Sequence, residues 1–149
     1  YRKDTTLAND ELTFPSSYTL GLGLTPLETW NFFATIRYRD WSSLKYNGVR
    51  EEKYKSVFSY SIGIEYSGAA GYKKRVFPLR VGYYKHPWYF NDASNESIQD
   101  DGITLGTNIP ILRRGGNLDI AVILGRRKTR TIEERFYHLA LGFNFYERW

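Results

Sequence analysis

Eight ionisable residues on the polar side of an alternating sequence pattern are the candidate functional residues of this chain. They are Arg37, Arg39, Glu65, Arg80, Asp119, Arg127, His138 and Arg148. Arginine binds carboxylates through two parallel hydrogen bonds, so a basic interior lined by these residues would attract an acidic head group. In the alternative interpretation, the arginines pair with carboxylates of neighbouring segments and keep a hydrated interior satisfied. For each residue taken singly, we favour this second interpretation.

Catalysis and metal binding are not indicated by the residue types present. His86 and His138 are the two histidines, and neither lies in a recognisable nucleophile motif. Cysteine is absent, which removes thiolate ligands and thiol nucleophiles. The acidic pairs at 51–52, 100–101 and 133–134 could gather calcium or lipopolysaccharide-bridging cations, but we favour their interpretation as solvated loop charges. We expect no catalytic residue, no metal site and no cofactor.

The elements that must position these residues are strands. Aromatic residues make up 17% of the chain, and mean hydropathy is −0.51 without any apolar run long enough for a membrane helix. A membrane strand exposes only every second side chain to lipid, so a low mean hydropathy is compatible with one. The net charge of +5 raises nucleic-acid binding as an alternative. Basic residues and aromatics fall on opposite faces, however, so no stacking platform forms and no nucleic-acid partner is expected.

Period-two alternation recurs in seven segments and predicts an all-β, antiparallel, up-and-down sheet. The expected strands are 16–26, 30–41, 56–67, 74–86, 102–112, 117–127 and 134–148. One face is apolar, and we expect the following members of it to be exposed: Tyr60, Ile62, Ile64, Leu79, Val81, Ile120, Val122 and Leu141. Glu65, Arg80 and Asp119 are expected on the opposite, inward face.

Three features favour a transmembrane β-barrel over a soluble barrel or sandwich. Short turns (26–29, 68–73 and 113–116) alternate with longer polar stretches such as 42–55 and 87–101. Glycines recur on the polar face, where a soluble barrel would need bulk. Tryptophans fall at the expected strand ends, where an aromatic girdle would lie at the two water–lipid boundaries. The girdle residues are Trp30, Trp41, Trp88 and Trp149.

The strand number indicates an incomplete barrel. Bacterial single-chain outer-membrane barrels have an even number of strands, eight or more, whereas this pattern predicts seven, with residues 1–14 as a preceding loop. Residues 1–149 are therefore expected to be the C-terminal part of a single barrel domain in the bacterial outer membrane. The first and last strands should then be free edges of the sheet.

Several phrases resemble the FadL-like family of outer-membrane transport proteins. They lie at 14–21, 37–43, 79–84 and 141–149 and read FPSSYTLG, RYRDWSS, LRVGYY and LGFNFYERW. The resemblance implies a larger closed barrel plugged by an N-terminal hatch, with lateral release of a hydrophobic substrate. The partners it implies are membrane lipid, a hydrophobic small molecule, and the missing N-terminal strands and hatch of the same protein.

On this basis the expected function is passive outer-membrane transport of fatty-acid-like molecules, without enzymatic activity. The first alternative is a non-transporting barrel with a structural or secretion-associated role. A soluble ligand-binding β-barrel is the second alternative, because alternation alone does not distinguish lipid from a protein core.

Overall fold

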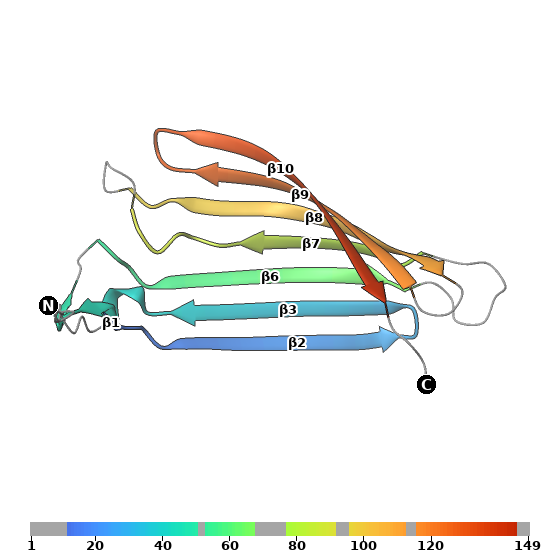
Figure 1. The fold of residues 1–149 in the computed structure, drawn as a ribbon, viewed down its shortest axis with the longest axis horizontal. Helices are drawn as coiled ribbons and strands as arrows, with labels where there is room; N and C mark the ends of the chain where they lie inside the picture. Colours follow the sequence, from blue (N-terminus) through green and yellow to red (C-terminus); the bar gives the residue numbers. More distant parts are fainter. Residues whose placement is uncertain (1–11, 51–52, 68–76, 92–95, 113–115, 146–149) are drawn as a thin grey trace, which may run out of the picture.

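The computed structural model describes residues 12–50, 53–67, 77–91, 96–112 and 116–145. Its main element is a seven-stranded antiparallel sheet with the order β10-β9-β8-β7-β6-β3-β2 (Figure 1). The strands are β2 (Ser17–Leu27), β3 (Trp30–Arg39), β6 (Val57–Tyr66), β7 (Leu79–Lys85), β8 (Gln99–Leu112), β9 (Gly116–Lys128) and β10 (Glu133–Phe145). Within this sheet, strands that follow one another in the sequence are direct neighbours, so the predicted meander is confirmed. The predicted portions 74–76 and 146–148 lie outside the described residues.

Prolines mark several strand ends. Strand β7 begins directly after Pro78 and ends before Pro87, which fits the inability of proline to donate to a sheet ladder. Pro26 and Pro110 coincide with register shifts near the ends of β2 and β8. Away from these shifts the strands pair residue by residue without interruption, so apolar residues of one strand lie opposite apolar residues of the next.

This register divides the sheet into an apolar face and a polar face. Directly paired residues of antiparallel strands point to the same side. One such line crosses the whole sheet, and its residues are Leu22, Ala34, Ile62, Tyr83, Ile103, Leu124 and Tyr137. The neighbouring lines are also rich in Leu, Ile, Phe and Tyr, so the apolar face is continuous from β2 to β10.

The apolar face is not covered by a second layer of the described residues. Within these ranges, the hydrophobic residues that are buried are Val57 and Ile98. Both lie at the end of the sheet where the longer connections from β3 to β6 and from β7 to β8 are found, which we call the loop end; the opposite end is the turn end. The predicted exposure is confirmed for Tyr60, Ile62, Ile64, Leu79, Val81 and Leu141. Ile120 and Val122 are half-buried instead: Ile120 lies between Thr107 and Leu141 of the neighbouring strands, and Val122 lies between two leucines, Leu105 and Leu139.

The sheet is open along both edges. Among the described residues β2 pairs only with β3, and β10 only with β9, so the two outer strands do not close a barrel. This confirms the expectation of two free edges. Strand directions alternate along the meander, so β2 and β10 run the same way, as their arrowheads show in Figure 1.

A small sheet at the loop end was not predicted. It has the order β1-β4-β5 and consists of β1 (Leu12–Thr13), β4 (Lys45–Tyr46) and β5 (Val49–Arg50), next to a short 3₁₀ helix, η1 (Trp41–Ser43). Asn47 and Gly48 connect β4 to β5 with φ angles of 50° and 79°, as a tight hairpin turn requires. No helix in the described part of the chain is both long and apolar enough to cross a membrane.

Candidate functional site

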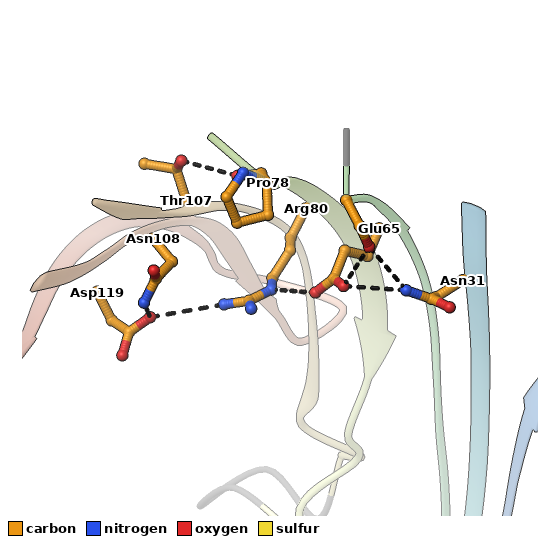
Figure 2. Close-up of polar contacts among 8 residues, drawn as sticks. Asn31, Glu65, Pro78, Arg80, Thr107, Asn108 and Asp119 are labelled. Carbon is orange, nitrogen blue, oxygen red and sulfur yellow. Dashed lines mark hydrogen bonds and ion pairs between the residues drawn. The ribbon is translucent and has the colours of Figure 1, made fainter. Parts of the chain in front are cut away.

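The centre of the polar face is a carboxylate–guanidinium–carboxylate cluster. Arg80 Nε donates to Glu65 Oε2 at 2.5 Å, and Arg80 Nη1 lies 3.6 Å from Asp119 Oδ1. Figure 2 shows the two carboxylates on opposite sides of the guanidinium. The Glu65 side chain is 17% exposed and that of Asp119 is 33% exposed, so the cluster is partly shielded from water.

Amide and hydroxyl groups extend this cluster across the sheet. Asn31 Nδ2 donates to Glu65 Oε1 at 3.1 Å, and Thr25 Oγ1 donates to Asn31 Oδ1 at 2.8 Å. On the other side, Asp119 accepts hydrogen bonds from Asn108 Nδ2, at 2.8 Å, and from Asn144. We call this set the polar row: Thr25, Asn31, Glu65, Arg80, Asn108, Asp119 and Asn144. It takes one residue from each of the seven strands.

Strand register explains why the polar row forms. Glu65 pairs directly with both Asn31 and Arg80, and Asn108 pairs directly with Asp119. The residue opposite Arg80 on β8 is Gly106, which has no side chain. The Arg80 guanidinium therefore has a free path over β8 to Asp119 on β9.

A second ionic cluster lies at the loop end of the polar face. Arg127 Nη2 is 3.2 Å from Asp100 Oδ2, and Tyr84 Oη donates to the other Asp100 oxygen at 3.1 Å. The Arg127 guanidinium carbon lies 4.4 Å from the centre of the Trp88 ring and 5.6 Å from that of Phe136. These are cation–π distances. Arg127 thus connects the polar face to the segment that follows β7 through its contact with Trp88.

The tryptophans occupy different environments. Trp30 lies at the turn end of the apolar face, with its ring centre 5.0 Å from that of Tyr66. Trp41 stacks on Tyr89 at 4.5 Å and lies under the Arg39 guanidinium, whose central carbon is 5.2 Å away. Trp41 and Trp88 therefore contact arginines of the polar-face phase. Trp149 and Arg148 lie outside the described residues.

The remaining candidates belong to neither cluster. Arg37 Nε donates to Thr19 Oγ1 at 3.3 Å, and the His138 ring centre is 5.0 Å from that of Phe136. The structure thus brings Glu65, Arg80 and Asp119 together, as their shared strand phase suggested. Sequence reasoning missed the neutral partners, among them Asn31 and Asn144. Asparagine in the polar strand phase was the available signal for them.

Polar contacts outside the strands hold the loops in place. Asp40 accepts hydrogen bonds from Ser42 and from Ser56, the latter at 2.6 Å, and these bonds lower the pKa of the Asp40 carboxyl. Burial lowers the pKa of Lys55, whose ammonium donates to Asn91 Oδ1 at 2.6 Å. In the ranges that the structure describes, no group of three or more His, Asp or Glu residues has the geometry to hold a metal ion.

A double-mutant cycle measures the central ion pair of the polar row. We expect Arg80→Gln and Glu65→Gln each to lower the free energy of unfolding of the detergent-refolded chain. Their coupling free energy should be about 1 kcal/mol, because the pair is partly shielded from water. Urea midpoints of the two single variants and the double variant give this value.

The control is the exposed pair Arg135–Glu133, whose Arg135 Nε–Glu133 Oε1 distance is 3.5 Å. Its side chains are 76% and 37% exposed, so the corresponding cycle should give a coupling near zero. Equal coupling in the two cycles would contradict a stabilising role for the polar row.

Comparison with known proteins gives one family. The family model described as BamG matches residues 2–149, which is nearly the entire chain. No curated protein and no solved structure matches the chain. The family is related to the BAM complex of outer-membrane biogenesis, and it associates the chain with the bacterial outer membrane.

This match corrects the family and function expected from the sequence. The FadL-like resemblance is wrong, and with it fatty-acid-like transport, a hydrophobic small-molecule substrate and a hatch of the same protein as partner. The phrases that suggested it are alternations of aromatic or aliphatic residues with Gly, Ser and Arg, which many amphipathic strands share. The non-transporting alternative agrees better with the match. The chain belongs to the BamG family.

Proposed function

We propose that this chain forms a membrane-embedded wall of an outer-membrane protein with a structural, non-transporting role beside the BAM machinery. The observation that carries the proposal is the continuous apolar face, which no described residue covers. Leu20, Ile62 and Leu141 are each more than half exposed, and they lie on β2, β6 and β10. An apolar surface that extends over a whole sheet is typical of a protein or membrane contact.

Strand length favours the membrane as that contact. A transmembrane β-strand needs about 9–11 residues when it is tilted. Strands β2, β3 and β6 have 11, 10 and 10 residues, and β8, β9 and β10 have 14, 13 and 13. Six of the seven strands are therefore long enough to cross the hydrocarbon layer.

The open edges set a condition on the membrane-embedded state. An unpaired backbone group costs several kcal/mol in lipid, so both β2 and β10 must be paired there. Because these two strands run in the same direction, an all-antiparallel closure needs an odd number of additional strands between them. Two copies inserted in the same orientation would pair their edges in parallel seams, so a second copy would satisfy the backbone groups but would not give an all-antiparallel barrel.

The polar row supports a structural role. Both carboxylates of the row already accept hydrogen bonds within the sheet, and Arg80 is shared between them. Such internal satisfaction stabilises the wall and leaves these groups engaged with one another. The polar row therefore links the seven strands to each other and has few groups left for a transported ligand.

Lipid quenching tests the membrane contact directly. The chain contains no cysteine, so Ile62→Cys and Ser61→Cys are clean single-label variants at adjacent positions of β6. After reconstitution in phospholipid vesicles, a fluorophore at Ile62 should be quenched strongly by lipids with brominated or spin-labelled acyl chains. The same label at Ser61 is the matched control and should be quenched weakly. Equal weak quenching at both positions would favour the soluble interpretation.

Depletion in the native bacterium tests the role in outer-membrane biogenesis. We expect the amounts of other β-barrel proteins in the outer-membrane fraction to fall when this protein is depleted, and to recover when it is restored. Uptake of a hydrophobic tracer is measured in parallel. Unchanged β-barrel proteins together with reduced tracer uptake would contradict the proposal.

A further inference from the structure

Arg37 and Arg39 differ from four other arginines of the seven-stranded sheet. Those four each have a carboxylate oxygen within 4 Å, and they are Arg80, Arg126, Arg127 and Arg135. Arg37 and Arg39 have none among the described residues. They are two positions apart on β3, so both lie on the polar face and form an uncompensated cationic pair.

The hydrogen-bond donors of this pair are largely unused by the described residues. Arg37 Nε donates to Thr19 Oγ1 at 3.3 Å, which leaves its two terminal nitrogens for another acceptor. Arg39 Nε is buried without an acceptor in the described part of the chain, as is Arg127 Nε, and Arg39 does not line the pocket beside Arg37. The Arg39 guanidinium carbon lies 5.2 Å from the centre of the Trp41 ring, which is a cation–π distance.

A pocket of about 200 Å³ lies beside Arg37 on the polar face. Its lining includes Thr35, Arg37, Ser59, Ser61, Tyr84 and His86, which come from β3, β6, β7 and the residue after β7. No carboxylate belongs to this lining. The nearby Asp100 is already engaged, because it accepts from Tyr84 Oη and pairs with Arg127. Arg37 and the hydroxyls of Thr35, Ser59 and Ser61 thus line the pocket without a carboxylate among the lining residues.

We propose that this pocket binds a phosphate group, either inorganic phosphate or a phosphomonoester. Arg37 supplies a planar fork of donors, and the hydroxyls of Ser59 and Ser61 donate from the next strand. Arg37 on β3 and the two serine hydroxyls on β6 together offer more than two donors, so they can engage more oxygens of a tetrahedral oxyanion than of a planar carboxylate. Its volume holds one phosphate with a few waters, since a water molecule takes about 30 Å³. The site does not depend on the role in biogenesis or on the membrane contact.

Arginine side-chain NMR of the full chain in detergent micelles, at low chloride and neutral pH, tests the site. Inorganic phosphate should shift the Arg37 Nε–Hε signal in a saturable manner and leave the Arg80 signal in place. Glycerol 3-phosphate is the second probe, and tighter binding of it would identify a phosphomonoester as the ligand. Acetate binding as tightly as either phosphate would overturn the proposal.

Two variants and one control link the binding to Arg37. Arg37→Gln should weaken phosphate binding about tenfold, because one charge-assisted hydrogen-bonding group is lost. Arg37→Lys keeps the charge without the fork, and it should bind with intermediate affinity. Arg135→Gln removes one positive charge from the opposite, apolar side of the sheet, so the affinity of this variant for phosphate should equal that of the parent chain.

Two further results would also overturn the proposal. One is an equal loss of affinity in the Arg37→Gln and Arg135→Gln variants, which would indicate unspecific attraction by net charge. The other is unchanged affinity in both Arg37 variants when circular dichroism reports the same sheet content as in the parent chain. If Arg37→Gln does not fold, the Arg37→Lys variant and the Arg37 signal of the parent chain still decide the outcome.

Discussion

The two-residue period of the strands, held in one register across seven of them, is the constraint on which the whole structure depends. Each antiparallel pair aligns apolar with apolar and polar with polar residues. A slip of one residue between any two strands would turn one apolar row toward the polar face. The exposed sheet of leucine, isoleucine and aromatic side chains, and the polar row behind it, both follow from this single register.

The polar face combines three kinds of electrostatic arrangement. In the polar row, Arg80 bridges carboxylates on β6 and β9, so its charge is neutralised by strands on either side. At the loop end, Arg127 is held by Asp100 and two aromatic rings, whereas Arg37 and Arg39 have no described carboxylate partner. The first two arrangements stabilise the sheet. Arg37 and Arg39 have no such partner among the described residues, so an external anion can neutralise their charge.

Sequence reasoning predicted the strands, their antiparallel order and the apolar face, because all three follow from local alternation. It also placed Glu65, Arg80 and Asp119 on one face. The link from Arg80 to Asp119 was beyond it, since that contact depends on the register of β8 and on the missing side chain at Gly106. The hairpin around Asn47 and Gly48 was missed although this dipeptide is a strong turn signal. Family resemblance misled because short aromatic and glycine phrases reflect strand physics shared by unrelated sheets.

The tilt of the strands in a lipid bilayer tests the central claim most directly. Polarised infrared spectroscopy of oriented membranes containing the full chain reports this angle through the dichroism of the amide bands. A membrane-embedded wall predicts strands tilted about 35–45° from the bilayer normal. Strands lying close to the membrane plane would show that the apolar face rests on the surface, and would contradict a wall that crosses the bilayer.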